Sequence, residues 1–412
     1  MENNKIQLKI NAEQSLIARE VPSQRVLEIT VVAPTKEKKS TRAVLNLALV
    51  IDRSGSMSGE KLEYVKQAAA FVVDRLEEND LCALVAYDDQ VHLLSSSIKM
   101  TGANRNEMKR LIREIRIGGT TNLSGGWLQG CQEVAATSDE KSINRTLLLT
   151  DGLANAGITD LEELAKHARE LANRGVSTST FGVGLGFNEH LLEAMSNQGR
   201  GNFYFIETPM QIPDIFLKEF NELATITASD VEIELEIPTQ VNVELLGGWA
   251  NNKKDGKFTI FAGNLYSGQN QEIYLKVLTP PAADKKELDF SARVMAKDED
   301  GKVIEDKAKW IFRYADAESV QKEDRQQDLL ERYATVEMAD RSTEALKLER
   351  AGEREKAHRL MNQSIQSNMP YLSEEILEKY QNTSHRMKRG MDETDRKSTQ
   401  YDAYRDKRRR GG

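Results

Sequence analysis

The spacing of hydrophobic residues changes several times along the chain. Residues 5–33 alternate between apolar and polar positions, which predicts β-strands. A charged linker, residues 36–39, separates them from a long region of continuous apolar runs and helical patterns. After residue 229 the alternation returns, and after residue 317 the spacing becomes helical. These changes predict several domains within one chain.

Between residues 42 and 226, strands and helices are expected to alternate. Residues 44–51 are apolar throughout, as in a parallel strand that is covered on both faces. Helical spacing follows at residues 61–79, and Ser58 is placed to cap that helix. The pattern repeats in strand-like runs at 81–87, 146–150, 176–183 and 203–206 and in helical stretches at 105–115, 123–136, 161–173 and 189–197. This predicts an α/β domain with a doubly wound, mostly parallel sheet.

Residues 229–315 predict a small antiparallel domain that resembles a β-sandwich. Apolar residues alternate with acids from Val231 onward, and Asp298-Glu299-Asp300-Gly301 has the composition of a hairpin turn. The strands of residues 1–34 are expected to complete this domain. The α/β domain would then be inserted between the two parts of the sandwich.

The C-terminal region is expected to be helical and then irregular. Residues 317–381 predict a helical hairpin, with a turn near Gly352, that packs on the β domain. Residues 382–412 are polar and basic, which predicts a mobile tail that folding does not need. The chain ends in Gly411-Gly412, the end that ubiquitin-like modifiers present to activating enzymes. We favour the alternative that this is an ordinary basic tail. Its arginines could contact nucleic acid weakly.

Composition narrows the functional classes. The chain has 412 residues, 30% charged and 39% hydrophobic, with a net charge of −8. This composition fits a soluble globular protein, and the negative charge argues against nucleic-acid binding by the whole chain. No run approaches the ~20 apolar residues of a membrane helix, and the N-terminus has no apolar segment typical of a secretory signal. Cys82 and Cys131 are expected to be free, buried thiols. We therefore expect a cytoplasmic location without membrane contact.

Three polar segments are expected at the edge of the sheet where ligands bind. In an open α/β sheet this edge is formed by the carboxyl ends of the strands. The segments are Asp52-x-Ser54-x-Ser56 after the first apolar strand, Thr120-Thr121-Asn122 in a loop, and Thr150-Asp151-Gly152 after a later strand. Five oxygen side chains without histidine or cysteine suit a hard cation such as Mg²⁺. Such a site is unfinished, and a carboxylate from another molecule could complete it.

These motifs resemble the metal-ion-dependent adhesion site of von Willebrand factor type A domains, over roughly residues 40–225. The resemblance implies that Asp52, Ser54, Ser56, Thr121 and Asp151 are the metal ligands, the hydroxyls directly and the aspartates often through water. Thr121 is chosen over Thr120 because the family threonine directly precedes Asn or Asp. The flanking segments 49–59, 181–184 and 202–206 resemble soluble bacterial proteins described as calcium-activated chloride channel-like, relatives of inter-alpha-trypsin inhibitor heavy chains.

The expected function is Mg²⁺-dependent protein–protein recognition by an adaptor or scaffold of a bacterial cytoplasm, with Mn²⁺ or Ca²⁺ as alternative ions. The partner would offer an Asp or Glu carboxylate to the metal, and no enzymatic activity is expected. A metal-dependent hydrolase or phosphatase is the main alternative, but a phosphatase of the aspartyl-phosphate kind would have a second acid where Ser54 stands. Asp88 and Asp89 are expected to form a turn between two strands and not a catalytic pair.

Overall fold

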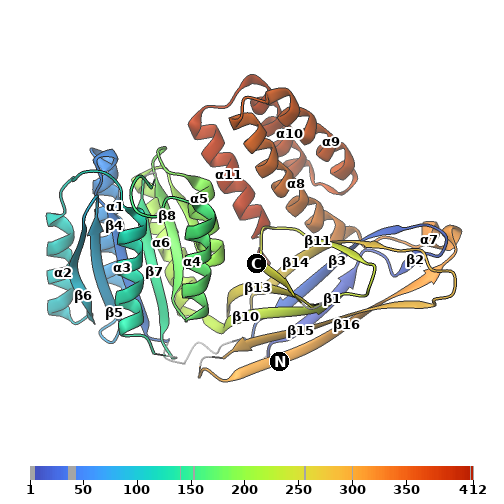
Figure 1. Cartoon of the computed structure of the whole chain (residues 1–412), viewed down its shortest axis with the longest axis horizontal. Helices are drawn as coiled ribbons and strands as arrows, with labels where there is room; N and C mark the ends of the chain where they lie inside the picture. The colour runs from blue at the N-terminus through green and yellow to red at the C-terminus, as the bar shows by residue number, and fades with distance from the viewer. Residues whose placement is uncertain are drawn as a thin grey trace. The chain divides into compact units, whose positions relative to one another are not determined.

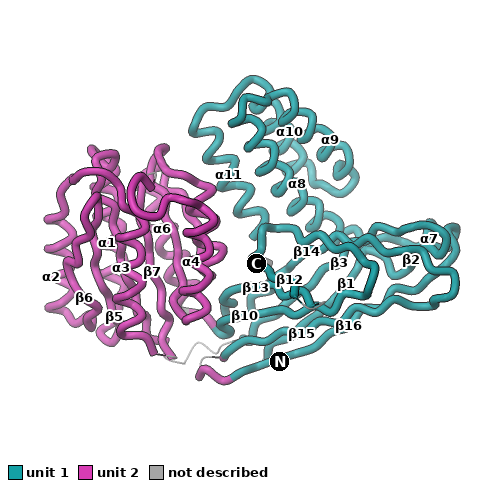
Figure 2. The backbone as a smooth tube through the Cα atoms, viewed as in Figure 1, with its two compact units in different colours: residues 1–36, 227–297, 303–412 teal, residues 37–226, 298–302 magenta. Residues whose placement is uncertain are grey.

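The computed structural model describes residues 5–35, 43–139, 141–151, 154–254, 257–298, 300–408 and 410–411. The predicted linker at residues 36–39 lies outside the described residues. The chain forms two compact units (Figure 2). One unit comprises Glu37–Ile226 and the short segment Asp298–Lys302, and the other comprises the remaining residues.

The Glu37–Ile226 unit is built on a six-stranded sheet. In spatial order its strands are β6 (Val91–Lys99), β5 (Leu81–Tyr87), β4 (Leu45–Asp52), β7 (Ile143–Thr150), β8 (Ser177–Val183) and β9 (Arg200–Ile206). Neighbouring strands are parallel except for β5 and β6, which are antiparallel and joined by a turn at residues 88–90. The predicted α/β sheet is therefore confirmed, as is the turn at Asp88 and Asp89.

Helices cover both faces of this sheet (Figure 1). They are α1 (Glu60–Arg75), α2 (Gly102–Glu114), α3 (Leu123–Ala136), α4 (Leu161–Asn173), α5 (Glu189–Gln198) and α6 (Ile212–Ala224), with short 3-10 helices η1 (Gly55–Met57) and η2 (Pro209–Gln211). Every residue of β4 and β8 is buried, which explains their continuous apolar or small-residue sequences. Ser58 does not cap α1 as expected, because Gly59, with a φ of 81°, occupies the N-cap position.

The second unit contains two sheets that pack as a sandwich. The first sheet has the order β1 (Gln7–Ala12), β3 (Ser23–Val32), β14 (Asn270–Thr279) and β11 (Asn242–Leu245), and β17 (Arg410–Gly411) also pairs with β14. The second has the order β12 (Ala250–Lys254), β13 (Lys257–Tyr266), β10 (Ile226–Glu236), β15 (Glu287–Lys297), β16 (Val303–Ala315) and β2 (Leu16–Ala18). Because β3 pairs with β14 along ten residues, strands from before and after the α/β unit share one sheet.

The two sheets bury a common hydrophobic core. Ile29 and Ile273 of the first sheet and Ile233 and Phe290 of the second belong to one cluster of buried residues. Along β10 the apolar residues are buried and the acids between them are partly exposed, as the alternation predicts. The turn between β15 and β16 closes with a hydrogen bond from the amide of Gly301 to the carbonyl of Asp298 (3.0 Å), although Glu299 lies outside the described residues.

Helices form the C-terminal part of this unit. They are α7 (Ala317–Lys322), α8 (Gln327–Arg350), α9 (Arg354–Asn368), α10 (Glu374–Arg389) and α11 (Glu393–Lys407), with a 3-10 turn η3 (Met369–Tyr371). Helices α8 and α9 pack together as the predicted hairpin. Leu329, Tyr333 and Val336 of α8 cluster with Val26 and Tyr274 of the first sheet, so the hairpin packs on the β domain as expected.

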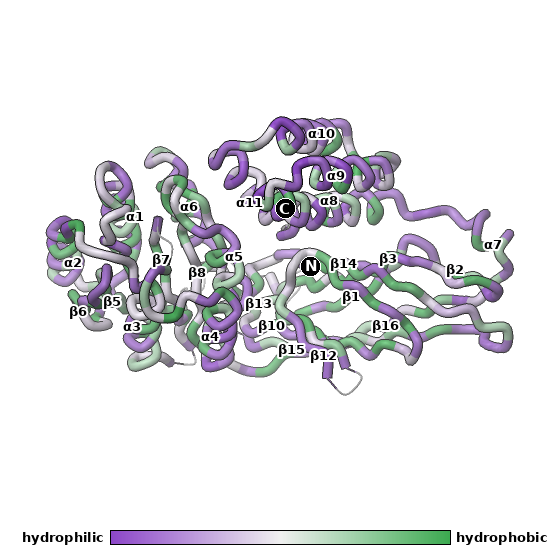
Figure 3. The backbone as a smooth tube through the Cα atoms, turned by 45° about the horizontal axis from the view of Figure 1, so that its top comes forward, coloured by the Kyte–Doolittle hydropathy of each residue, from purple (hydrophilic) through white to green (hydrophobic). Residues whose placement is uncertain are grey.

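The prediction of a mobile tail at residues 382–412 is wrong for the part that forms α10 and α11. Tyr380 and Met387 of α10 join a buried cluster with residues of α8 and α9, and α11 packs against α8. On α11, the buried residues include Lys397 and Gln400, with exposures of 2% and 1%. The apolar pattern misses these helices because much of their buried surface is polar. Most of their residues are hydrophilic, as the largely purple tube in Figure 3 shows.

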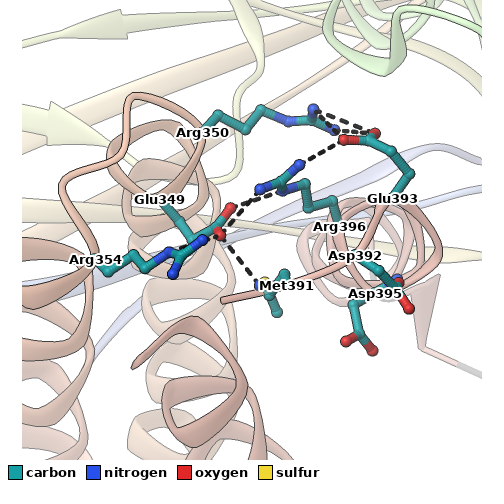
Figure 4. A network of polar contacts seen from close by, with 8 residues as sticks. All are labelled: Glu349, Arg350, Arg354, Met391, Asp392, Glu393, Asp395 and Arg396. Atoms are coloured by element: carbon teal, nitrogen blue, oxygen red, sulfur yellow. Dashed lines mark hydrogen bonds and ion pairs between the residues drawn. The ribbon is translucent and has the colours of Figure 1, made fainter. Parts of the chain in front are cut away.

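A network of charged residues ties the start of α11 to the end of α8 (Figure 4). The buried carboxylate of Glu349 accepts hydrogen bonds from Arg396 Nε (2.7 Å) and from the amide of Met391 (3.1 Å). Arg396 also donates to Glu393 (2.6 Å), which pairs in turn with Arg350. The contacts of Glu349 with Arg396 and Met391 and of Arg350 with Glu393 join residues more than 40 positions apart, so no local pattern reveals them.

The end of the chain contacts the sandwich. Gly411 pairs with Asn270 of β14, and the guanidinium of Arg408 lies 3.6 Å from the ring centroid of Trp249. Gly412 and Arg409 lie outside the described residues. Two of the residues expected to be free in a tail, Arg408 and Gly411, are therefore held by the β domain.

The two cysteines are as the sequence predicts. Cys82 and Cys131 are free and buried, and burial raises the pKa of each thiol to about 12, so both are neutral. In the part of the chain that the structure describes, no helix is both long and apolar enough to span a membrane.

Candidate metal site

The loop after β4 brings three of the predicted ligands together. Asp52 is the last residue of β4 and is fully buried, while Ser54 is 1% exposed and Ser56 is exposed. The amide of Ser54 donates to Asp52 Oδ1 (2.8 Å), and the hydroxyls of Ser54 and Ser56 are hydrogen bonded to each other (3.1 Å). The tight turn thus directs one carboxylate and two hydroxyls toward one place, which is open to the outside at Ser56.

The end of β7 adds the fourth residue. Because β7 is parallel to β4 and next to it, their carboxyl ends meet at the same edge of the sheet. Ser56 Oγ donates to Asp151 Oδ1 (2.8 Å), and Thr150 Oγ1 donates to Asp52 Oδ2 (2.5 Å). Asp151 is 1% exposed, and the following Gly152 lies outside the described residues. Asp52, Ser54, Ser56 and Asp151 therefore form one hydrogen-bonded group.

The loop of Thr121 reaches this group through its backbone. The amide of Gly55 donates to the carbonyl of Gly119 (2.8 Å), and the amide of Gly118 donates to the carbonyl of Arg53 (2.8 Å). Thr121 is buried and Thr120 is exposed. Among the described contacts, however, no hydrogen bond joins the Thr121 hydroxyl to the other four residues. The structure brings the loop to the site without showing this hydroxyl in contact.

Asp88 holds the Thr121 loop in place, which the sequence did not reveal. Its carboxylate accepts hydrogen bonds from the amides of Gly119 (2.9 Å) and Gln90 (3.0 Å) and from Arg53 Nη2 (3.0 Å). Burial raises the pKa of Asp88, but these donors outweigh it and hold the pKa below its ordinary value. A Cβ atom on Gly118 would lie 1.7 Å from Asp88 Oδ2, so only glycine allows this close approach.

Burial makes the charge of Asp52 costly. Burial raises the pKa of the Asp52 carboxyl, and hydrogen bonds from Thr150 and Ser54 oppose this rise. The nearby Asp151 raises the pKa of Asp52 further. The hydroxyl of Tyr87 is buried beside this carboxylate, and burial together with Asp52 raises the pKa of Tyr87 well above its ordinary value. A cation at this edge would stabilise the charged form of Asp52.

Lys61, which the sequence analysis did not identify, supplies a positive charge to the site. Its ammonium forms an ion pair with Asp151 Oδ2 and donates to the carbonyl of Ser56 (3.2 Å). The Asp151 side chain is fully buried, whereas that of Lys61 is 31% exposed. One signal was available: Lys61 stands in the first turn of α1, where the helix dipole disfavours a cation unless it has a specific partner.

The donor set of the site fits a hard divalent cation. It offers two buried carboxylates and serine hydroxyls, with the buried Thr121 in the adjoining loop, and it contains no nitrogen or sulfur ligand. Mg²⁺ takes six oxygen ligands in octahedral geometry, so these residues would leave at least one position for an outside donor. Within the described ranges, no three His, Cys, Asp or Glu side chains gather as a metal-binding cluster.

Comparisons with known proteins identify the domain in which these residues lie. A family model of the von Willebrand factor type A domain matches residues 46–218. The uncharacterized protein sll0103 of Synechocystis sp. is 30% identical over 235 residues, covering 57% of this chain and 54% of that protein. Inter-alpha-trypsin inhibitor heavy chain H3 of Homo sapiens is 26% identical over 230 residues, covering 53% of this chain and 25% of that protein. The chain thus spans about half the length of the first relative and a quarter of the second.

Solved structures share the fold over nearly the whole chain. The von Willebrand factor type A protein from Catenulispora acidiphila superposes with a TM-score of 0.76 at 16% identity, covering 98% of this chain and 97% of that one. The ArnB paralog VWA2 from Sulfolobus acidocaldarius gives a TM-score of 0.66 at 15% identity, covering 98% of both chains. The family model thus identifies residues 46–218 as a von Willebrand factor type A domain, and the solved structures share the fold of the chain.

Proposed function

We propose that this chain is a binding module that recognises a partner protein through a divalent cation, with Mg²⁺ as the first candidate and Mn²⁺ or Ca²⁺ as alternatives. The ligands would be Asp52, Ser54, Ser56, Thr121 and Asp151. Domains of this family often mediate metal-dependent protein–protein interactions. The observation that carries the proposal is the convergence of two buried carboxylates and two serine hydroxyls at one edge of the sheet.

The surroundings of the site favour a partner protein over a small molecule. Three of the large apolar side chains that are exposed lie in the segments that follow the strands or adjoin the site loop: Ile117 (40% exposed), Leu185 (42%) and Met210 of η2 (82%). Ile117 precedes the Gly118-Gly119 segment, Leu185 follows β8, and Met210 follows β9. Exposed apolar residues around a polar centre are typical of protein interfaces. A partner Asp or Glu would take the open position on the metal, and these residues would contact its flanks.

We also propose that the chain is not an enzyme. A two-metal hydrolase requires a second group of acidic or histidine ligands, and the described residues hold no such cluster. A phosphatase that forms an aspartyl phosphate would require an acid two residues after Asp52, where Ser54 stands. A phosphatase and esterase screen with and without Mg²⁺ tests this, and Mg²⁺-dependent turnover that Asp52→Ala abolishes would contradict it.

Calorimetric titration with MgCl₂ tests the metal site. We expect one ion per chain, with binding lost in Asp151→Ala because a buried carboxylate ligand is removed. Asp74→Ala is the matched control, because Asp74 lies in the same unit but is exposed and pairs only with Lys109 in the described contacts. Equal Mg²⁺ affinity in the wild type and Asp151→Ala would refute the ligand assignment.

Affinity capture tests recognition. The immobilised chain should retain a partner in Mg²⁺ and release it in EDTA, and Asp52→Ala should fail to retain it. Circular dichroism of Asp52→Ala should stay nearly unchanged, because the apolar core of β4 and β7 does not use the metal. Retention that is indifferent to EDTA and to Asp52→Ala would mean that the partner binds elsewhere.

We place this adaptor or scaffold in a bacterial cytoplasm. Its two cysteines are free, as expected in a reducing compartment, and it is related to a protein of Synechocystis sp.. Fractionation of producing cells with immunoblotting tests the location. Recovery of the chain outside the cytoplasm would contradict it.

A further inference from the structure

A groove lies between helices α1 and α2 of the von Willebrand domain, with a volume of about 470 Å³. Four cations line it: Lys66 of α1, Lys109 and Arg113 of α2, and Arg116 just after α2. The only acid among its described lining residues is Glu63. The groove is therefore locally basic in a chain whose net charge is −8.

The two arginines retain their charge for an outside ligand. Arg113 is exposed, and no described carboxylate pairs with it. Arg116 donates only to main-chain oxygens in the described contacts, those of Arg113 (3.0 Å) and Ile115 (3.4 Å). Lys66 and Lys109 are paired with Glu63 (2.9 Å) and Asp74 (2.7 Å). The basic character thus comes mainly from the α2 side of the groove.

We propose that this groove binds an acidic peptide segment of a partner protein. Lys109 and Arg113 are one turn apart on α2, about 6 Å along the axis at the helical rise of ~1.5 Å per residue, and Arg116 lies beyond the end of the helix, so the cations follow one another along the groove. Carboxylates spaced along a peptide match this distribution. Ala70, which is partly exposed, gives the groove apolar surface for the peptide stem, and the buried Ile112 lies beneath it.

A peptide fits the groove better than a nucleic acid does. Single-stranded nucleic acids bind with their bases stacked on aromatic side chains, and none of the described lining residues is aromatic. The negative net charge of the chain also opposes a long polyanion beyond the short basic stretch. An oligonucleotide is therefore the comparison ligand in the test.

The residues that line the groove do not include the proposed metal ligands, so EDTA can be added to keep the metal site empty during the measurement. The probe is a fluorescein-labelled ten-residue peptide with four glutamates spaced by alanine and leucine, and the matched peptide has glutamine at the four positions. Fluorescence anisotropy should show micromolar binding of the glutamate peptide and at least tenfold weaker binding of the glutamine peptide. Raising NaCl from 50 to 500 mM should weaken binding by at least tenfold. A glutamate peptide that does not bind overturns the proposal.

Arginine variants locate the binding. Arg113→Gln combined with Arg116→Gln should weaken peptide binding at least tenfold. Arg110→Gln should change it less than twofold, because Arg110 lies on the same helix outside the groove lining and pairs with Glu107 and Glu114. Circular dichroism should be the same for all three proteins. An equal loss in Arg110→Gln, no loss in the double variant, or tighter binding of a ten-nucleotide oligothymidylate would each overturn the proposal.

Discussion

Lys61 gives the metal site a positive charge of its own. Asp52 and Asp151 are both buried, and two neighbouring carboxylates in a buried site disfavour each other's charged form. The Lys61 ammonium on Asp151 offsets part of this cost without a metal ion. Without a metal ion, Lys61 therefore still compensates part of the negative charge of the two aspartates.

Replacing Lys61 by methionine should change metal affinity and metal-free stability in opposite directions. Without a like charge beside the ion, Mg²⁺ should bind roughly tenfold tighter, about 1.4 kcal/mol. In EDTA the variant should be less stable by about 1–3 kcal/mol, because a buried carboxylate loses its partner. Calorimetry and thermal melting measure the two effects. Lys66→Met on the same helix is the control for Mg²⁺ affinity, and weaker Mg²⁺ binding in Lys61→Met would show that Lys61 supports the ion.

Glu13 should make the stability of the β unit depend on pH. Burial raises the pKa of its carboxyl from 4.5 to about 7, against the opposing hydrogen bond from the amide of Val26. The folded state thus holds a proton that the unfolded state releases above pH 4.5. The stabilisation is full below that pH and is lost as the pH rises through 7, by roughly 3 kcal/mol at most.

Glu13→Gln should remove this contribution, because glutamine stays neutral and can still accept the Val26 amide. Urea unfolding at pH 5 and pH 8 should show a smaller fall in stability for Glu13→Gln than for the wild type. Glu20→Gln, at an exposed position, should behave like the wild type. If the unfolding free energies of Glu13→Gln and the wild type fall equally between pH 5 and pH 8, Glu13 is already ionised at pH 5 in the folded chain.

At the level of elements, the C-terminal helices depend on buried polar contacts as well as on apolar packing. Helix α11 buries Lys397, Gln400 and Lys407, and Lys407 Nζ donates to Thr343 Oγ1 of α8 (2.8 Å). The turn between α10 and α11 is held by Glu349 (Figure 4). Each such contact requires the helices to be in place already, so the helices stabilise one another cooperatively.

Glu349→Ala should destabilise the helical region by about 3 kcal/mol. The substitution leaves the amide of Met391 without its acceptor and Arg396 with only Glu393 among the described contacts. Glu344→Ala on the same helix should cost less than about 1 kcal/mol, because that side chain is 55% exposed and pairs with Arg341 at the surface. Urea unfolding followed by circular dichroism measures both. Equal costs would mean that the buried network adds no stability of its own.

At the level of the whole molecule, the α/β unit is almost continuous in sequence, whereas the sandwich is assembled from segments on both sides of it. The strands and helices of the α/β unit bury their own apolar residues, including all of β4. The sandwich, by contrast, requires β3 beside β14, from segments separated by more than 200 residues. The two units should therefore differ in their ability to fold alone.

A fragment of residues 43–226 should fold alone and bind Mg²⁺ with an affinity within threefold of that of the full chain. Its proposed ligands and Lys61 all lie within this range. Circular dichroism and calorimetry on the purified fragment test the expectation. A fragment that is unfolded, or that is folded without binding Mg²⁺ when the full chain binds it, would show that the second unit contributes to the site.

Local information was enough to predict the α/β unit and the convergence of four of the five proposed ligands. Continuous apolar runs identify strands that are buried on both faces, and polar residues directly after such runs must lie at the ligand-binding edge. Asp52, Ser54, Ser56 and Asp151 were therefore predictable, and the structure places them in one hydrogen-bonded group. The alternation of apolar and polar residues also predicted strands of the sandwich, because successive side chains of a strand point to opposite faces and only one face of each sheet is buried.

Only the tertiary structure decided the contacts that depend on how distant segments meet. Lys61 and Asp151 are 90 residues apart, and Asp88 reaches Gly119 across 31 residues, so neither pairing follows from a local pattern. Helices α10 and α11 were missed for the same reason, because lysine and glutamine become buried only when another helix supplies hydrogen-bonding partners. Hydrophobic periodicity reports the burial of apolar side chains, whereas the burial of charge depends on a partner that the fold alone provides.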